Sequence, residues 1–450
     1  MNKDRYIAAL EISSSKVIGA VGIAGESGQL EIIAVEQNKF TDSVRFGQIQ
    51  NSEETSRLAN FVLERLQRRN NIAPREINGV YVGLSGRSLR SIPINVSLSL
   101  PDDTEISEAI IERLRQSALD EDIDNSLEIV DAVPRIFKVG KTETHRPVGM
   151  MGNSVSATYD LIVARPAIRS NLRRVIVDKL NLDIKGMVVT PLATGYIALS
   201  EQEKKLGCML VDIGAETTTV TIYSRGNLVY FATIPLGGRN ITRDLTSLNE
   251  LEKNAEELKL NFGNAVAPAG ASQLKVGRHK QSDISNLVVA RAEELVANII
   301  EQPHFAGLTE ADIPEGIVLC GGGARLNGLM DLLGKYSGMK VRMASLPSYI
   351  RMADSNGQGM DSLQLAAIMY AGAEKSTDEC LAVPTEQPQT GDDTNGAGNE
   401  AGDDDDEPQK KKKKKEKGSG FWTKLGTSFG NTLGMMFNPI GDDDEGDELN

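Results

Sequence analysis

The sequence predicts an α/β protein with two related lobes and an inserted α+β subdomain, followed by a disordered tether and a terminal amphipathic helix. Strand-like segments alternate with amphipathic helices over residues 1–375, which is typical of a mixed or parallel sheet covered by helices. Two stretches of this body open in the same way, with a strand, a turn rich in glycine or hydroxyl groups, and another strand. These observations indicate an internal duplication of one sheet-forming unit.

The first lobe is expected to begin with two strands and a helix. The strands span 6–12 and 17–23, and the helix spans about 53–69 with acidic residues in its first turn, where they favour a helix start. The apolar face of this helix is expected to comprise Leu58, Phe61, Val62 and Leu66. We assign residues 1–85 and 166–205 to this lobe.

The segment 86–165 interrupts the first lobe and has its own pattern. Alternating apolar residues predict a strand around 92–98, a helix follows at 107–119, and two further strands lie near 129–139 and 156–163. We expect an inserted α+β subdomain.

The second lobe is expected to repeat the opening of the first. Strands are predicted at 208–213, 219–223 and 228–234. We assign 206–244 to this lobe, 245–314 to its small subdomain, and 315–375 to the rest of the lobe and a return to the first.

Composition excludes several classes of protein. The 450 residues suggest roughly three folding units, and no apolar run approaches the ~18 residues of a membrane-spanning helix. The start of the chain lacks the basic and apolar regions of a secretory signal, so we expect a cytoplasmic protein. Most of the net charge of −14 lies beyond residue 375, and the nearly neutral body argues against nucleic-acid binding. Three scattered cysteines predict reduced, mostly buried thiols (Cys208, Cys320 and Cys380).

Two turns have the composition of phosphate-binding loops. In residues 8–17, a strand ending near Glu11 turns through Ser13, Ser14 and Ser15 to Lys16, so that N–H groups, hydroxyls and one positive charge could surround a phosphate. In residues 210–219, Asp212 could hold a hydrated metal ion, and the residues expected to contact phosphate are Gly214, Thr217 and Thr218. Taken alone, a serine turn after a strand is more often structural, and Asp212 is as readily an ordinary strand-end residue.

A third turn, in residues 318–328, is rich in glycine. An apolar strand runs into Gly321, Gly322 and Gly323, which would let a flat base lie against the backbone before a helix begins. Because three consecutive glycines seldom serve packing alone, this is the strongest of the three signals.

The three turns in this order resemble the superfamily of actin, DnaK-type chaperones and sugar kinases, and most of the body resembles the FtsA family of bacterial division proteins. The resemblance extends over PLATGYIALSEQEKKLGCMLVDIG (191–214) and AEELKLNFGNA (255–265). The insertion, with VPRIF (133–137) and PVGMMG (147–152), resembles the domain specific to that family.

The resemblance implies an actin-like fold that binds ATP with Mg²⁺, with Asp212 at the metal. The adenosine contacts would be Glu256, Lys259, Gly321, Gly322, Gly323 and Arg325. It also implies self-association into filaments, anchoring of FtsZ through the region 245–314 to the inner face of the cytoplasmic membrane at the division site, and recruitment of later division proteins.

The chain departs from the family pattern in both phosphate turns. Glu11 and Ser13 stand where aspartate and glycine are usual, and Glu216 and Thr219 where glycine and aspartate are usual. A carboxylate about 4 Å from a triphosphate is repulsive by roughly 1 kcal/mol even in water. We therefore expect no dedicated catalytic residue and at most weak ATP hydrolysis.

The C-terminal part is predicted to be a tether and a membrane device. Residues 376–419 are dominated by Pro, Gly, Asp, Thr and Lys, so they cannot bury enough apolar area to fold. On a helix, residues 420–437 gather their apolar side chains in one arc. This arc comprises Phe421, Trp422, Leu425, Phe429, Leu433, Met436 and Phe437. An acidic tail (438–450) follows, and six consecutive lysines (410–415) could attract anionic lipid.

Other interpretations remain open at this stage. Residues 420–437 could dock on the body or in a groove of a partner. A sugar or acetate kinase would share the three turns, but it would carry a catalytic acid and have no need of a membrane helix. The pilus protein PilM resembles the body and its insertion, and it typically lacks the terminal amphipathic helix, which is therefore the discriminating feature.

Overall fold

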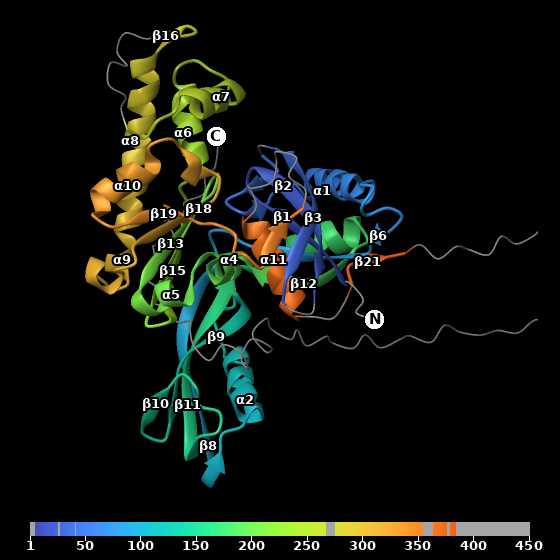
Figure 1. Cartoon of the computed structure of the whole chain (residues 1–450), viewed down its shortest axis with the longest axis vertical. Coiled ribbons are helices and arrows are strands. Elements are labelled where there is room, and N and C mark those ends of the chain that lie inside the picture. Colours follow the sequence, from blue (N-terminus) through green and yellow to red (C-terminus); the bar gives the residue numbers. More distant parts are fainter. Residues whose placement is uncertain are drawn as a thin grey trace, which may run out of the picture.

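The computed structural model describes residues 5–25, 28–40, 42–266, 275–353, 363–375 and 379–383. They form two lobes side by side, a small helical subdomain at one end of the second lobe, and an insertion that projects from the opposite end (Figure 1). The predicted tether from 384 onwards, the membrane segment 420–437 and the acidic tail lie outside the described residues.

The first lobe is built on a six-stranded sheet with the order β12-β7-β1-β2-β3-β20. β1, β2 and β3 are antiparallel neighbours, and β7 is parallel to both β1 and β12. The strands are β1 (Arg5–Ile12), β2 (Lys16–Ala24), β3 (Leu30–Lys39), β7 (Gly79–Leu84), β12 (Asp183–Val189) and β20 (Ile350–Met352). Both predicted opening strands are confirmed.

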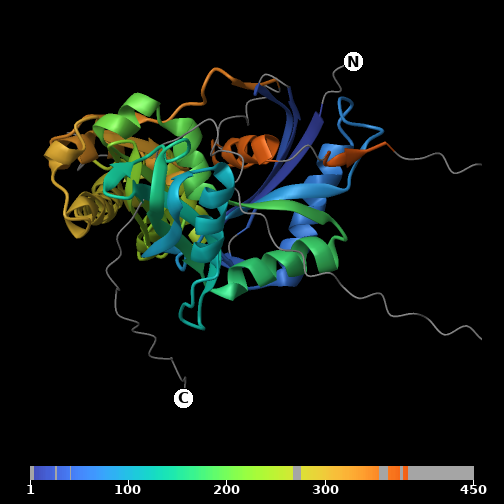
Figure 2. The same cartoon turned by 90° about the horizontal axis from the view of Figure 1, so that it is seen from below.

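Helices cover this sheet, and α11 returns from the second lobe to pack on it (Figure 2). They are α1 (Ser52–Gln67), α3 (Pro166–Arg173), the π-helical turn η1 (Arg174–Lys179), α4 (Thr190–Ala198) and α11 (Leu363–Lys375). The Asn51 side chain caps α1 by accepting from the N–H of Glu54 at 3.0 Å. The prediction that Phe61 lies on the buried face of α1 was wrong. Its side chain is 46% exposed and lies under the guanidinium of Arg65, because the buried stripe runs through Ala59, Val62, Leu63 and Leu66.

The second lobe repeats the sheet of the first. Its order is β15-β14-β13-β18-β19, with three antiparallel neighbours followed by parallel β18 and β19, which matches β3-β2-β1-β7-β12 strand for strand. The strands are β13 (Cys208–Ile213), β14 (Thr218–Ser224), β15 (Asn227–Ile234), β18 (Ile317–Cys320) and β19 (Val341–Met343). Further helices are α5 (Glu201–Leu206), η4 (Gly323–Arg325) and α10 (Leu329–Ser337). The predicted duplication is therefore present.

The small subdomain of the second lobe has a separate apolar core that joins α6, α7 and α8. Its elements are α6 (Gly238–Thr246), α7 (Glu252–Phe262), β16 (Lys275–Val276), β17 (His279–Lys280) and the first half of α8 (Gln281–Ile300). The second half of α8 packs in the core of the second lobe's sheet, and α9 (Gln302–Phe305) and η3 (Glu310–Asp312) follow it. Ile241 of α6 lies in this core, so the subdomain begins before the predicted boundary at 245.

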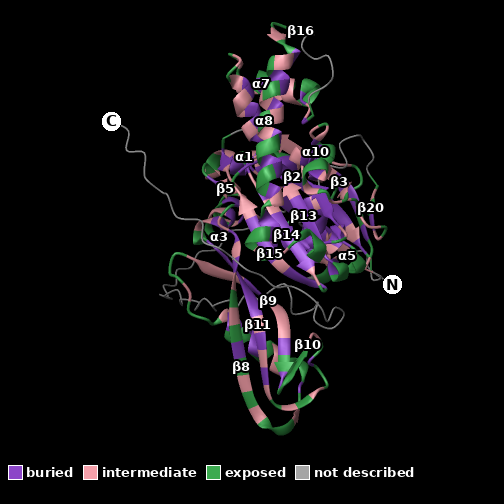
Figure 3. Ribbon diagram, turned by 90° about the vertical axis from the view of Figure 1, so that its left-hand side faces the viewer, coloured by how far each residue is buried: buried purple, intermediate pink, exposed green. Residues whose placement is uncertain are grey.

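The insertion is a four-stranded antiparallel sheet with one helix, which contains the three predicted strands and the predicted helix together with a short strand, β10, that was not predicted. Its order is β10-β9-β11-β8, and the elements are β8 (Arg90–Glu105), α2 (Glu108–Leu119), β9 (Glu128–Val139), β10 (Thr142–Thr144) and β11 (Met151–Ala164). Exposed residues alternate with partly or fully buried ones along 92–101 of β8 (Figure 3). One sheet face therefore packs on α2 and the other faces solvent.

The folded body continues past residue 375. β21 (Leu381–Ala382) pairs with β6 (Glu76–Ile77), and the buried Cys380 donates its N–H to Tyr6 O at 2.9 Å. The prediction that the tether begins at 376 was therefore wrong for 379–383, because a long-range strand pairing that local composition does not reveal holds this segment. Cys208, Cys320 and Cys380 are buried thiols that form no disulfide, as expected. Among the described helices, none is long and apolar enough to cross a membrane.

Candidate functional site

Two carboxylates lie where the equivalent strands of the two lobes end. Glu11 is the penultimate residue of β1 and Asp212 that of β13. Burial raises the pKa of Glu11 to about 7, against the opposing charge of Lys16 and with a further increase from Asp212. Burial also raises the pKa of Asp212, which accepts a hydrogen bond from Gln364 of α11. Such a pair suits a divalent cation, because the positive charge of the ion offsets the repulsion between the two carboxylates.

The serine turn after β1 is closed by hydrogen bonds within the first lobe. The Ser13 N–H and hydroxyl both donate to Lys16 O at 3.0 Å. The buried Ser14 hydroxyl accepts from the N–H of Gly47 at 2.9 Å. Ser15 O accepts from the N–H of Phe40. The predicted phosphate residues 13–16 thus lie together in one turn, in contact with the hairpin of β4 (Val44–Arg45) and β5 (Gln48–Ile49).

The turn after β13 packs against the start of α6. Gly214 O accepts from the N–H of Gly238, and Ala215 O accepts from the N–H of Arg239. A Cβ atom on Gly237 would lie 2.7 Å from both Gly214 O and Ala215 O, so only glycine fits there. Of the two predicted phosphate contacts that follow, Thr217 is partly exposed, whereas Thr218 is fully buried and its hydroxyl donates to Leu236 O at 2.7 Å.

The three glycines after β18 differ from one another. Gly321 has φ +85°, and a Cβ atom there would lie 2.3 Å from Asp212 Oδ1. A Cβ atom on Gly323 would lie 2.5 Å from the Ile213 side chain, whereas one on Gly322 would meet nothing within 4 Å. Gly321 and Gly323 therefore let β18 approach the second phosphate turn, and Gly322 borders open space. Arg325 is exposed at the end of this turn.

Glu256 and Lys259 of α7 reach the first turn of α6. Lys259 Nζ lies 3.1 Å from Gly238 O, 2.9 Å from Thr242 Oγ1 and 2.7 Å from Glu256 Oε2. Burial lowers the pKa of Lys259, although the charge of Glu256 opposes this. Both predicted residues therefore lie beside the glycines of the cleft. Sequence reasoning missed Gly237, Gly238 and Thr242, although a glycine pair directly before a helix is a readable signal.

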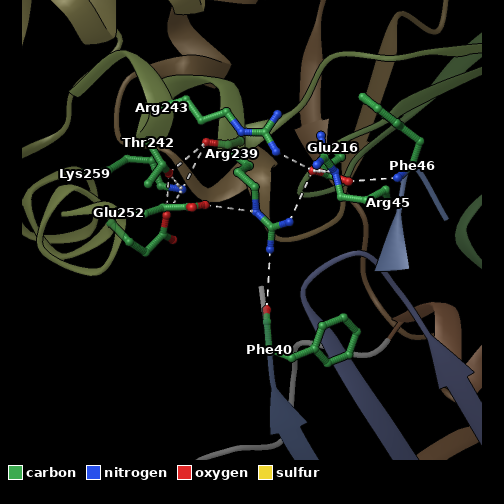
Figure 4. Close-up of polar contacts among 11 residues, drawn as sticks. Phe40, Arg45, Phe46, Glu216, Arg239, Thr242, Arg243, Glu252 and Lys259 are labelled. Atoms are coloured by element: carbon green, nitrogen blue, oxygen red, sulfur yellow. Dashed lines mark hydrogen bonds and ion pairs between the residues drawn. The ribbon is translucent and has the colours of Figure 1, made fainter. Parts of the chain in front are cut away.

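The Glu216 carboxylate is not free but is held in an ion-pair network that the sequence did not indicate. Its side chain is 1% exposed and accepts from the N–H of Phe46 at 2.8 Å. Arg45, Arg239 and Arg243 lie 3.0, 3.2 and 2.8 Å from Oε1 (Figure 4). These donors lower the pKa of Glu216 in spite of its burial, because they stabilise the charged form.

The arrangement can hold a metal-bound anion between the lobes. Two carboxylates lie at the ends of the equivalent strands β1 and β13, a turn follows each of them, and α6 begins beside the second turn. An α-helix N-terminus with nearby glycines favours phosphate. The fold and this site define an actin-like two-lobed protein with an inserted subdomain.

Comparisons with known proteins agree with this class. The family model described as cell division protein FtsA matches residues 209–357, and that of the SHS2 domain inserted in FtsA matches residues 86–163. FtsA of Bacillus subtilis is 30% identical over 369 residues, covering 79% of this chain and 81% of that protein. FtsA of Porphyromonas gingivalis is 29% identical over 354 residues, covering 75% and 72%. The chain belongs to the FtsA family of cell division proteins.

A solved structure supports the fold alone. A chain of the PilM-PilN type IV pilus biogenesis complex superposes with a TM-score of 0.59 at 18% identity, covering 82% of this chain and 97% of that chain. The predicted actin-like fold and the predicted insertion are therefore confirmed.

Proposed function

We propose that this chain binds ATP with Mg²⁺ in the cleft between its lobes and acts as a division scaffold. The carrying observation is that Glu11 and Asp212 are the penultimate residues of the equivalent strands β1 and β13, and that the charge of Asp212 contributes to the raised pKa of Glu11. Mg²⁺ is commonly bound by one or two carboxylates together with substrate phosphates. In this proposal Glu11 and Asp212 hold the ion, Lys16 and residues 13–15 and 214–217 face the phosphates, and Gly322 with α7 borders the nucleoside.

Nucleotide binding is tested on the intact chain by titration calorimetry with ATP and Mg²⁺. We expect binding that requires Mg²⁺ and is lost in Asp212→Asn. The matched variant is Asp244→Asn, which removes a carboxylate that pairs with Arg291 on α8. We expect it to bind nucleotide normally. Binding that persists in Asp212→Asn and is independent of Mg²⁺ would contradict this assignment.

We further propose slow turnover. A clear rate of phosphate release that disappears in Asp212→Ala would contradict this part, because it would show a catalytic centre in the cleft.

Membership of the FtsA family and the C-terminal pattern support the proposed scaffold role. We propose that residues 420–437 bind the inner face of the cytoplasmic membrane at the division site. In this proposal the body self-associates into filaments, the region 245–314 binds FtsZ, and later division proteins are recruited. The apolar arc containing Trp422 and Phe429 supports the membrane part, because an amphipathic helix with aromatic residues lies stably at the headgroup boundary.

Liposome co-sedimentation tests the scaffold role. The intact chain and a chain ending at Gly418 are mixed with anionic vesicles, with and without purified FtsZ. We expect only the intact chain to pellet and to carry FtsZ with it. Phe429→Glu should abolish pelleting, whereas Ser428→Glu, with the same charge on the polar face, should weaken it only slightly. If the intact and shortened chains behave alike, residues 420–437 are not the anchor.

A further inference from the structure

Glu216 is surrounded by donors from both lobes. From the first lobe come the N–H of Phe46 and the guanidinium of Arg45, and from α6 of the second lobe come Arg239 and Arg243. Three of these four contacts converge on the single oxygen Oε1. Planar guanidinium groups and a backbone N–H are the donors that proteins also use for phosphate oxygens.

The cluster carries more positive than negative charge. Three guanidinium groups face Glu216 and one further carboxylate, Glu252, which lies 3.6 Å from Arg239 Nε. The guanidinium of Arg87 adds another positive charge over the Phe46 ring, 5.3 Å from its centroid. Glu216 and Glu252 together carry fewer charges than the four arginines around them, so the cluster has a net positive charge. Arg239 is 8% exposed, and the unbalanced charge at this depth favours a further anion.

The cluster lies between the two phosphate turns. Phe46 and Gly47 are adjacent at the tip of the β4–β5 hairpin. The N–H of Phe46 binds Glu216 in the second turn, and the N–H of Gly47 binds Ser14 in the first. Phe46 has φ +49°, which non-glycine residues seldom adopt, so these contacts hold the tip in an unfavourable conformation. An anion bound across the two turns would therefore meet Arg45 and the hairpin tip.

We propose that Arg45, Arg239, Arg243 and the N–H of Phe46 form a site for the terminal phosphate of a nucleoside triphosphate, which Glu216 occupies as an internal anion. This inference rests on the proposed nucleotide binding and deepens it. A triphosphate takes over donors from Glu216, whereas a diphosphate leaves them on the carboxylate. The cluster thereby distinguishes the two nucleotides. Since Glu216 joins the lobes through Arg45 and Phe46, a triphosphate would also change the contact between the lobes.

The test measures the ratio of affinities for AMP-PNP and ADP, each with Mg²⁺, by calorimetry on the full chain. Glu216→Gln removes the competing charge with little change of shape, so we expect the ratio to rise by about 10-fold, the size of one charge-assisted hydrogen bond. Arg45→Met removes a donor whose side chain is 40% exposed. It should lower the ratio by a similar factor without unfolding the protein.

The matched control is Glu36→Gln. Glu36 is also buried and paired with two arginines, Arg65 and Arg69, but it lies on β3 and faces α1, away from the turns. The ratio of affinities for AMP-PNP and ADP in Glu36→Gln should stay within about twofold of that of the unchanged chain. If both nucleotides bind and neither Glu216→Gln nor Arg45→Met changes the ratio, the inference is overturned and Glu216 only joins the lobes. If the unchanged chain binds neither nucleotide, the proposed function fails and this inference fails with it.

Discussion

The turns that follow β1 and β13 occupy equivalent places in two equivalent sheets but are stabilised differently. The first is closed by hydroxyl and carbonyl groups, with Ser13 bonded to Lys16 O and Ser14 to the N–H of Gly47. The second is closed by the approach of glycines, at 237, 321 and 323, and by the charge on Glu216.

The difference indicates which of the two turns can change its conformation more easily. A single hydroxyl hydrogen bond, such as that of Ser13 or Ser14, is worth about 1 kcal/mol. Close backbone packing does not relax without a larger loss of free energy. The second turn should therefore be the fixed side of the cleft and the first turn the adjustable side.

The largest effect is expected from Glu216→Ala. Removing the carboxylate takes the nearer of two anions from the buried Arg239, which should lower the free energy of unfolding by about 3 kcal/mol. Urea unfolding followed by circular dichroism measures the loss. Glu64→Ala, which breaks an exposed pair with Arg68 on α1, should cost less than about 0.5 kcal/mol. Equal losses of unfolding free energy in the two variants would show that the charge on Glu216 does not stabilise the second turn.

Gly321→Ala should cost about 2 kcal/mol or more, because it adds a Cβ atom against Asp212 at a positive φ. Gly322→Ala, at the neighbouring position with open space around its Cβ, should change stability by less than about 0.5 kcal/mol. Thermal unfolding of the two variants distinguishes the effect of a clashing Cβ atom from the effect of replacing a glycine. Similar melting temperatures would show that the second turn is not fixed by backbone approach.

The next effect concerns pH. The folded-state pKa of Glu11 is about 7, against 4.5 ordinarily, so the folded protein holds this proton more tightly. The contribution of Glu11 to stability is therefore fully present below pH 4.5 and is lost as the pH rises through 7. Binding of Mg²⁺ with nucleotide needs the ionised carboxylate, so affinity should be about 10-fold lower at pH 6 than at pH 8. Glu11→Gln should remove this part of the pH dependence, and an unchanged profile would exclude Glu11 from the metal site.

The smallest effect is expected from Ser14→Ala, which loses one hydrogen bond to the hairpin tip and should cost about 1 kcal/mol. Because Ser14 and Glu216 hold adjacent residues of that tip, the same change should cost about 0.5 kcal/mol less when made in Glu216→Ala. A double-mutant cycle on unfolding free energies measures this coupling. Strict additivity would mean that the two turns do not communicate through the hairpin.

The sequence predicted the duplicated strands and the insertion well, because strand alternation and turn residues are local signals. It also indicated which turns meet in the cleft, since equivalent strands end at equivalent edges. It could not indicate the role of Glu216, whose hydrogen bond to Phe46 spans 170 positions. Without its arginine partners, Glu216 could only be interpreted as a repulsive charge.

Two other differences have the same physical origin. Residues 379–383 have the composition of a tether, yet they pair with β6, some 300 positions away in the chain. Phe61 fits the apolar period of α1 by spacing, yet it lies at the edge of the buried stripe, under Arg65. Both outcomes depend on which element packs opposite, and local pattern does not contain that information.

The strand pairing of residues 379–383 determines which elements bear a mechanical force applied to the C-terminal chain. Cys380 O accepts from the N–H groups of Asn78 and Gly79, and its own N–H donates to Tyr6 O. A pull beyond Val383 therefore loads β6 and β1 before it reaches α11. Tyr6 lies near the start of β1 and Glu11 near its end. A force from the C-terminal segment would therefore act on one end of this strand, and an ion bound by Glu11 would act on the other.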